Sequence, residues 1–340
     1  MSDQKEIPNP SMEEDAYWLC NLVRNGDGSL TRRGNLPTPP AIPEIEPDSF
    51  LHIKTLSRDI PVNPNNKTYI RLYRPRNIPP ETKLPLIIYF HGGGFFWLGS
   101  DNILSTEVCN RMAAHIPAVI ACVEYRPSPE NRLPAAYEDA VECIIWAKTQ
   151  ASAAAAGGDG ACDSWMKELV DFSRVFLKGR GAGGNIAYHA ALRVVDLDIE
   201  PMKIVGLIMN QPFFGGLQRT ESEIKYGNDQ LIPLHVTDLM WSLTLPEGAD
   251  RGHEYCDPLN LGSYGDNIGR LPTSVVRTYE GDILVDRLVD FAKMLEARGV
   301  HVVCQVIEGG YHAVDLIDPI FSQAFNDDIR DLVTSIAVVE

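Results

Sequence analysis

The sequence predicts an α/β fold: a mostly parallel, doubly wound sheet with helices on both faces. Six apolar runs are nearly continuous rather than alternating in polarity, which is typical of parallel strands covered on both sides. Helical patterns lie between the runs, so strand and helix alternate along the chain. A length of 340 residues permits one large domain or two smaller ones, and we predict a single domain over residues 1–340.

The expected strands and helices follow from local patterns. In chain order the strands are LPLIIYF up to residue 90, AVIACVEY (118–125), RVFLKG (174–179), VGLIMNQPFF (205–214), SVVRTYEG (274–281) and VVCQVIEGG (302–310). The helix PAAYEDAVECIIWAK has Pro134 at a first-turn position and apolar residues at helical spacing. The helix RLVDFAKMLEARG ends on Gly299, a residue suited to a C-terminal cap.

Two segments do not follow this alternation. Residues 1–50 are rich in proline and acidic residues, with a short amphipathic piece around MEEDAYWLCNLV. Residues 215–262 form an irregular polar and aromatic insertion between two expected strands, and long insertions of this kind often act as lids. We therefore expect lid elements at about 1–45 and 215–250. The low-complexity tract 151–165 is expected to be a helix end that runs into a flexible loop.

Composition and charge limit the classes of partner. Hydrophobic residues make up 44% and charged residues 22% of the chain, as in ordinary soluble globular proteins. The net charge of -16 argues against nucleic acid and anionic membranes, which are bound through basic patches. No run approaches the roughly 18 apolar residues of a membrane span, and the polar N-terminus shows no secretory signal. We expect a small-molecule substrate or ligand, no nucleic acid and no membrane.

The cysteines and histidines predict neither disulfides nor a metal. The seven cysteines are odd in number and form no CxxC pair, and several lie within apolar runs. We expect buried free thiols in a reducing compartment, with the cytoplasm as the default. His115, His235 and His253 have no spacing that suggests metal ligands, so we expect no metal, and we expect no other cofactor.

The motif HGGGFF (91–96) follows the first of the apolar strands directly. Three glycines at the end of a strand leave backbone N–H groups exposed, with no side chain in the way. Such groups can stabilise an oxyanion as it develops on a substrate. A plain tight turn is the alternative, but three consecutive glycines after a histidine at a buried strand end favour the oxyanion role.

The turn KGRGAGGN (178–185) has the features of a nucleophile elbow, G-x-S-x-G, between a strand and a helix. Gly179, Gly183 and Gly184 permit the close approach of strand and helix, and Ala182 offers the next backbone N–H. Gly181 occupies the position of the serine. A strained position with positive φ costs a non-glycine residue about 1–3 kcal/mol, so glycine supports the turn but has no oxygen with which to attack.

An acid and a histidine follow the elbow, in YEGDILVD (279–286) and EGGYHAVD (308–315). The order of elbow, acid and histidine is that of a Ser-Asp-His triad on a parallel sheet. Considered separately, Asp282 is more simply explained as an ordinary turn residue or helix N-cap, and His312 as a histidine of a surface loop. Together, at two strand ends on the elbow's edge of the sheet, they predict a hydrogen bond that orients the imidazole. Asp286 and Asp315 are weaker candidates for the acid.

These motifs resemble plant carboxylesterases of the hormone-sensitive-lipase type, the group that also gave rise to the gibberellin receptors. The resemblance runs from about residue 15 to the end, and its motifs are HGGGFF, EYRPSPENRLPAAYEDA (124–140), FLKGRGAGGNIAYHAAL (176–192), residues 219–258, GDILVD (281–286) and GGYHAV (309–314). It implies an α/β-hydrolase fold with an N-terminal lid, an oxyanion hole and a Ser-His-Asp triad.

The resemblance also assigns roles to particular residues. Gly93, Gly94 and the Ala182 N–H take the oxyanion role, and Asp282 and His312 take their triad roles. Where the family usually reads GDSAGG, this chain has Arg180 in place of the acid and Gly181 in place of the serine. The family's YRLAPEHRLP reads YRPSPENRLP here.

Three functions remain open. The first is a non-hydrolytic lyase or cyclase of plant specialised metabolism, with His312 as base, because some members of the resembled family are dehydratases and cyclases. The second is an inactive small-molecule receptor, although gibberellin receptors typically lack the histidine rather than the serine. The third is a hydrolase with a substitute nucleophile, or an inactivated variant. Two adjacent changes, at residues 180 and 181, make a simple serine knockout a poorer explanation.

Other residues near the motifs are candidates for substrate binding or support. The candidates for lining an apolar pocket, together with Arg180 at the elbow, are Phe95, Phe96, Trp97, Phe213, Phe214 and Trp241. Ordinary core packing is the alternative for the aromatic ones. Tyr125 and Arg126 are expected to brace the oxyanion loop, through hydrogen bonds and an ion pair with Glu130 or Asp139. His189 is expected to be a packed structural residue.

Overall fold

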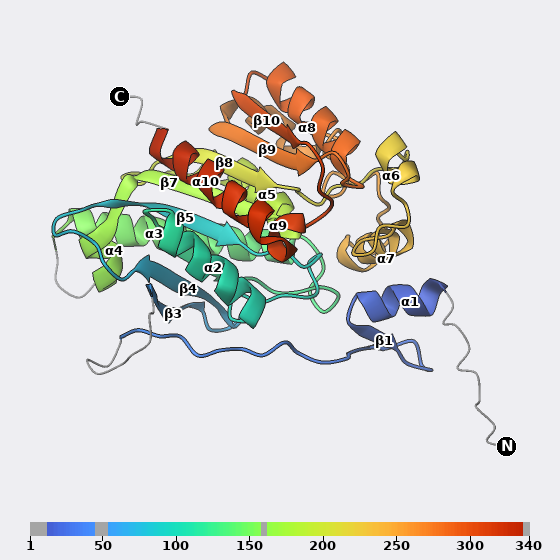
Figure 1. The fold of residues 1–340 in the computed structure, drawn as a ribbon, viewed down its shortest axis with the longest axis horizontal. Helices are drawn as coiled ribbons and strands as arrows, with labels where there is room; N and C mark the ends of the chain where they lie inside the picture. The colour runs from blue at the N-terminus through green and yellow to red at the C-terminus, as the bar shows by residue number, and fades with distance from the viewer. Residues whose placement is uncertain (1–11, 45–53, 158–161, 336–340) are drawn as a thin grey trace.

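The computed structural model describes residues 12–44, 54–157 and 162–335. Its core is an eight-stranded sheet in the order β10-β9-β8-β7-β5-β6-β4-β3, in which only the pairs of β4 are antiparallel (Figure 1). The strands are β3 (Thr55–Asn63), β4 (Thr68–Pro75), β5 (Leu84–Phe90), β6 (Val119–Glu124), β7 (Val170–Arg180), β8 (Ile204–Asn210), β9 (Thr273–Tyr279) and β10 (Val302–Ile307). The six predicted runs are the six strands from β5 to β10, so the mostly parallel α/β sheet is confirmed.

Two strands of the sheet, β3 and β4, were not predicted. Charged residues interrupt their apolar pattern, which hides them from a search for continuous apolar runs. In the sheet these charges neutralise one another, because Arg71 of β4 lies opposite Asp59 of β3 and donates to its carboxylate at 2.6 Å. This cross-strand pair lets a nearly buried arginine sit within a sheet.

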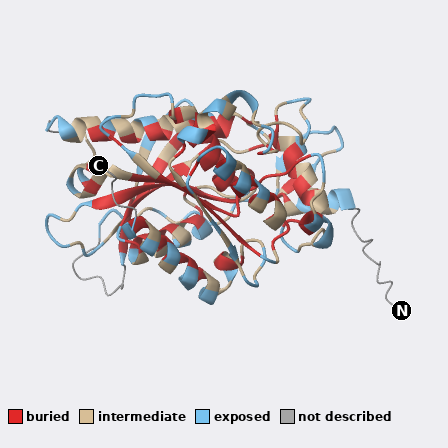
Figure 2. Ribbon diagram, turned by 90° about the horizontal axis from the view of Figure 1, so that it is seen from above, coloured by how far each residue is buried: buried red, intermediate tan, exposed pale blue. Residues whose placement is uncertain are grey.

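Helices cover both faces of the sheet (Figure 2). One layer contains α3 (Ala135–Ala155), α5 (Ala182–Val194) and α8 (Val285–Ala297), and the other contains α2 (Ile103–His115) and α10 (Pro319–Ser335). Both helices predicted from boundary signals are present. The first begins directly after Pro134, and Gly299 has a φ of 87° just beyond the end of the second.

The low-complexity tract 151–165 contains more helix than predicted. Helix α3 continues to Ala155, and a further helix, α4 (Ser164–Leu169), begins within the tract. Asp163 caps α4, since its side chain accepts from the N–H groups of Trp165 and Met166. Residues 158–161 of the predicted loop lie outside the described residues.

The two predicted lid segments lie side by side. The N-terminal one holds α1 (Met12–Leu19) and a hairpin of β1 (Leu22–Arg24) and β2 (Leu30–Arg32), and the insertion holds α6 (Glu221–Lys225) and α7 (Leu234–Thr244). Helix α1 packs against α7 (Figure 1), and His235 of α7 lies 3.1 Å from the Asp15 carboxylate of α1. Residues 1–11 and 45 of the predicted lids lie outside the described residues.

The sulfur and membrane predictions can be compared with the described part of the chain. All seven cysteines are free thiols there, and five are buried, but Cys162 is half-buried and Cys304 is exposed. The prediction of free thiols is therefore confirmed, and the prediction that they are buried is wrong for Cys304, which lies on strand β10 at the sheet edge. None of the helices between residues 12 and 335 is long and apolar enough to cross a bilayer.

A buried lysine leads to a testable pH dependence of stability. Lys178 of β7 is 1% exposed, and its ammonium lies over the rings of Tyr89 and Phe325. Burial, together with the Arg180 charge, lowers the pKa of Lys178 to about 7. Unfolding therefore lets Lys178 take up a proton between about pH 7 and pH 10, so the contribution of this side chain to the free energy of unfolding should rise with pH by about 1 kcal/mol per unit.

Denaturant titrations across this pH range measure the effect. The slope of the free energy of unfolding against pH should be more positive in the native chain than in Lys178→Met. The comparison is needed because burial raises the pKa of thiols such as Cys20 and Cys256, which contribute an opposite slope to both proteins above about pH 8. Lys178→Met should also stabilise the protein at neutral pH. An equal slope in the native and variant proteins would show that Lys178 is not the group responsible.

Candidate active site

The carboxyl ends of five strands meet at one edge of the sheet and carry the predicted site. His91 follows β5, Gly181 follows β7 and Gln211 follows β8. Asp282 and His312 lie in the loops after β9 and β10. Because parallel strands all point the same way, residues up to about 220 positions apart in sequence are brought together here.

The elbow between β7 and α5 has the backbone geometry that the glycine pattern predicts. Gly181 has φ 51° and ψ -121°, a conformation that non-glycine residues rarely adopt. Gly183 is required for packing, because a Cβ there would lie 2.0 Å from the Phe90 carbonyl oxygen. A Cβ on Gly181 would instead meet nothing within 4 Å. The space that a side chain at residue 181 would enter is thus open rather than filled by another side chain.

The glycine loop after β5 is fixed by contacts of Tyr125 and Arg32 with the residues that flank its glycines. Gly93 and Gly94 both have positive φ, 100° and 61°, which turns the loop back on itself. The His91 ring stacks on Tyr125 at 4.2 Å between centroids, and the Tyr125 hydroxyl donates to the His91 carbonyl at 2.9 Å. Burial lowers the pKa of His91 to about 4, so this ring is neutral and structural at ordinary pH. Arg32 of β2 donates to the Phe96 carbonyl at 2.5 Å, which ties the N-terminal hairpin to the loop.

The acid and the histidine are in contact. His312 Nδ1 lies 3.2 Å from each carboxylate oxygen of Asp282. The carboxylate is fully buried and also accepts from Leu284 N at 3.0 Å and from Gln211 Nε2 at 2.5 Å. Burial by itself raises the pKa of Asp282, but the His312 charge and these hydrogen bonds outweigh it and hold this pKa below its usual value. An ionised Asp282 therefore orients the imidazole.

The two weaker acid candidates have other partners. Asp286 accepts from the Ser222 N–H at 2.6 Å, at the start of α6. Asp315 is buried and forms an ion pair with Arg180, while Asn210 donates to it at 3.2 Å. Of the three aspartates, Asp282 is the one in contact with His312.

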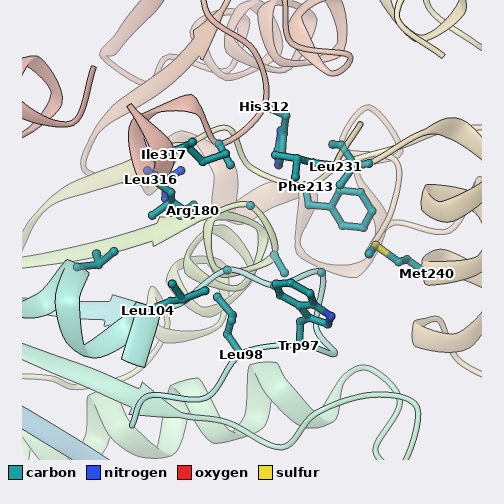
Figure 3. Close-up of a pocket in the computed structure, with 18 of the residues that line it drawn as sticks. Trp97, Leu98, Leu104, Arg180, Phe213, Leu231, Met240, His312, Leu316 and Ile317 are labelled. Atoms are coloured by element: carbon teal, nitrogen blue, oxygen red, sulfur yellow. The ribbon is translucent and has the colours of Figure 1, made fainter. Parts of the chain in front are cut away.

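A cavity of about 330 Å³ opens in front of these groups. It is within the size range of sites that enclose drug-sized ligands. Its lining includes the glycine loop, Gly181, Ala182 and His312. Figure 3 shows Trp97, Phe213 and Met240 on one side of the cavity and Leu104, Leu316 and Ile317 on the other. The cavity thus has two apolar walls, with the His312 ring and the elbow between them.

The site lies within a recognised family match. Residues 87–316 match the family model described as alpha/beta hydrolase fold. The chain belongs to this family. The resemblance to plant carboxylesterases of the hormone-sensitive-lipase type is likewise confirmed, since several of them are homologous over most of the chain.

Individual relatives give the degree of similarity. The 3-O-acetylpapaveroxine carboxylesterase CXE1 of Papaver somniferum is 44% identical over 94% of this chain and 97% of its own. Carboxylesterase 20 of Arabidopsis thaliana is 41% identical over 92% of this chain and 94% of its own. Gibberellin receptor GID1 of Oryza sativa subsp. japonica is 35% identical over 66% of this chain and 59% of its own. The solved hyperthermophilic esterase of Pyrobaculum calidifontis superposes with a TM-score of 0.68 at 26% identity, over 86% of each chain.

The residues predicted to bind substrate in this α/β-hydrolase-fold protein divide into two groups. Trp97, Phe213 and the stem of Arg180 line the cavity. The other predicted aromatic residues are buried and are not among those that line the cavity, which favours the alternative of core packing for Phe95, Phe96, Phe214 and Trp241. Trp241 stacks on Phe213 at 4.7 Å between centroids, so it supports the wall from behind. The Arg180 guanidinium is paired with Asp315 rather than presented to the cavity.

The supporting residues Arg126 and His189 have the predicted surroundings, and of the two acids predicted for Arg126 the structure shows Asp139. Arg126 pairs with Asp139 at 2.8 Å. Glu130, the alternative partner, is instead bound by Arg32 of the N-terminal hairpin. His189 is buried and stacks on Tyr137, in keeping with a structural role.

Several residues of the site were not predicted. The walls also contain residues from α1, the loop after β5, α2, α9 (Val314–Ile317) and the insertion, namely Leu19, Leu98, Leu104, Val108, Leu231, Ile232, Met240, Leu316 and Ile317. These are isolated apolar residues with no motif, so local sequence could not reveal them. Gln211 was also missed, although its position at the end of an apolar strand, on the edge that carries the triad, could have indicated it.

Proposed function

We propose that this protein is a non-hydrolytic lyase or cyclase that acts on a small, largely apolar carbonyl compound. His312 is the general base, and Asp282 orients it. The N–H groups of Gly93, Gly94 and Ala182 bind the oxyanion that forms on the substrate carbonyl. The observation that supports this most is the retained contact of His312 with Asp282 beside an open position at Gly181. The base couple has kept its geometry although its serine is gone.

The proposed reaction is an elimination. Nε2 of His312 removes a proton from the carbon next to the substrate carbonyl, and the carbonyl oxygen takes up negative charge toward the backbone donors. The electron pair then forms a carbon–carbon double bond and expels a leaving group, such as acetate, from the adjacent carbon. On an enone substrate, Nε2 of His312 can instead take the proton of an internal hydroxyl group, whose oxygen adds to the carbon β to the carbonyl while the carbonyl oxygen takes up negative charge toward the backbone donors. The α-carbon then takes the proton back from His312, and the product is a ring.

The lining of the cavity argues against a substitute nucleophile. None of the described residues that line it is a serine, threonine, cysteine, lysine or tyrosine. Its one carboxylate residue, Glu107, is paired with Arg111 at 2.9 Å. An acyl-enzyme therefore has no evident oxygen or sulfur on which to form, and a chain without its triad nucleophile retains only about 10³–10⁴-fold catalysis over water.

The relative from Papaver somniferum and the apolar walls of the cavity support a small, largely apolar substrate that carries an acetyl group. That relative is named for an O-acetylated compound. A substrate of this kind could lose its acetyl group by elimination here rather than by ester cleavage. We further propose that the segments around α1 and α7 are lids, because Leu19 and Met240 contribute to the walls from them. A cytoplasmic location fits the free thiols and remains a prediction.

A suitable probe is 3-acetoxy-1,3-diphenylpropan-1-one, which has an apolar group on each side of its carbonyl. Elimination converts it to an enone and acetic acid, whereas hydrolysis gives the β-hydroxy ketone and acetic acid. The enone is measured by its ultraviolet absorbance and by mass spectrometry. Formation of the β-hydroxy ketone with no enone would contradict the proposal and favour a hydrolase.

A small-molecule receptor is the second candidate, favoured by the similarity to the rice gibberellin receptor. His312→Ala separates the two functions. As a lyase, the protein should lose at least about 100-fold in enone formation, because general base catalysis contributes about that much or more. Binding of the probe, measured by calorimetry, should change little.

The matched control is His301→Ala, which removes an exposed histidine elsewhere. It should leave both enone formation and binding at the native level. Tight binding of the probe with no product from either the native chain or the control would favour the receptor.

A further inference from the structure

Gln211 lies at the centre of the contacts that hold the His312 loop. Its side chain is fully buried, and both ends of its amide are used. Nε2 donates to Asp282 Oδ2 at 2.5 Å and to the Tyr311 carbonyl at 3.2 Å. Oε1 accepts from the Ala313 N–H at 3.0 Å. One amide thus touches the orienting acid and the backbone on both sides of His312.

The orientation of this amide is fixed by its partners. The Tyr311 carbonyl can only accept, so it requires the nitrogen end of Gln211. The Ala313 N–H can only donate, so it requires the oxygen end. A flipped amide would break both contacts. With the nitrogen directed at Asp282, the acid must present an unprotonated oxygen, which is the form that orients an imidazole.

The backbone at Gln211 is unusual. Its φ is 47°, a value that non-glycine residues adopt rarely, and the residue lies directly after strand β8. Its N–H donates to the Arg277 carbonyl of β9 at 2.7 Å, which anchors this conformation to the neighbouring strand. Ala313, its partner in the His312 loop, also has a positive φ of 60°. Such conformations persist where the surrounding contacts hold them, and they cluster at functional sites.

We propose that Gln211 is a positioning residue that sets the His312–Asp282 couple through these three hydrogen bonds. It does not touch the substrate, because it is not among the residues that line the cavity. This inference rests on the proposed role of His312 as base. It adds a third residue to the couple, from the position directly after strand β8, that neither the order of motifs nor the comparisons assign.

The test uses two substitutions of Gln211 and one control. Gln211→Leu keeps a similar size and removes all three hydrogen bonds. Gln211→Glu keeps the shape but places a second carboxylate against Asp282. The matched control is Gln150→Glu, the same change at another buried glutamine that accepts from the Asp163 N–H. Each is made in the Gly181→Ser background, in which hydrolysis of p-nitrophenyl acetate reports on the base.

Gln211→Leu should lower kcat about 100-fold with little change in KM, because a small misplacement of a catalytic group costs about that much. Gln211→Leu should also move the acidic limb of the pH–rate profile to higher pH, because without the Nε2 donor the Asp282 charge is less compensated and favours the protonated imidazole. Gln211→Glu should lower kcat less, because a carboxyl that shares a proton with Asp282 can still donate to it and accept from the Ala313 N–H. The His312 ring-proton titration by NMR in the otherwise native chain should show the Gln211→Leu displacement and needs no turnover. The Gln150 control should change neither measurement.

A purely structural glutamine would give a different result. The Gln211 variants would then lose thermal stability but keep the parent's kcat per folded molecule and its titration midpoints, and that result would overturn the inference. Failure of the native chain to form the enone, combined with the expected Gln211 effects, would overturn the lyase proposal alone.

Discussion

Gly181→Ser should turn this protein into an esterase. A Cβ at residue 181 meets no atom within 4 Å, so a hydroxyl there would extend into the open cavity beside His312 and the glycine loop. Loss of a triad serine costs about 10⁶-fold in kcat where it has been measured. We therefore expect a gain of about 10⁴-fold or more in hydrolysis of p-nitrophenyl acetate, measured as nitrophenolate release. The gain should be accompanied by lower stability, about 1–3 kcal/mol, because the φ at residue 181 is 51°.

The control for this gain is Gly181→Ala, which adds the Cβ and the strain without the oxygen. It should be as inactive as the native chain and lose a similar amount of stability. Adding His312→Ala to Gly181→Ser should abolish the new activity. If the serine variant is folded and still no better than the alanine variant, then His312 and the backbone donors are not aligned on the elbow. That result would also contradict the proposed elimination, which needs the same alignment.

The parallel part of the fold could be predicted from sequence because its strands are buried on both faces. Continuous apolar runs such as that of β5 are a direct consequence of this burial. Strands β3 and β4 could not be predicted from continuous apolar runs, because each contains charged residues. Arg71 and Asp59 neutralise each other only when the two strands pair in the sheet. Helix α4 was missed for a different reason. It has only six residues, too few for a periodic pattern, and its start is marked only by the side-chain cap of Asp163.

In the site, too, local motifs predicted some residues, while residues brought together only by the fold could not be predicted. Asp282 and His312 could be paired in advance because chain order and strand polarity bring two loops to one edge. The cavity walls could not be predicted, because they combine single side chains from helices far apart in sequence, such as Leu104 and Met240. The position of an aromatic residue next to a motif did not predict whether it lines the cavity. Phe95 and Trp241 pack behind Phe213 instead of reaching the cavity.

Arg180 is the other residue of the elbow that departs from the family's usual motif, and it contributes an ion pair to the fold as well as to the lining of the cavity. Its guanidinium pairs with Asp315, three residues after His312, and both side chains are more than nine-tenths buried. An acidic residue at position 180, as the family resemblance would place there, would instead face the Asp315 carboxylate. Residues 180 and 181 therefore have separate effects: Gly181 leaves the elbow without a side chain, and Arg180 joins the elbow strand to the loop of His312.

Asp315→Leu should destabilise the protein by about 3–5 kcal/mol, because it leaves the Arg180 charge buried without its partner. The double variant Arg180→Met/Asp315→Leu should recover most of this loss, since it removes the charge that the single change leaves unpaired. Urea denaturation measures the free energy of unfolding of each. The exposed pair of Arg270 and Asp196 is the control, and Asp196→Leu should destabilise the protein far less than Asp315→Leu does, because water screens an exposed ion pair. A double variant as unstable as Asp315→Leu alone would mean that packing around Asp315, and not its pairing with Arg180, holds the His312 loop against the elbow.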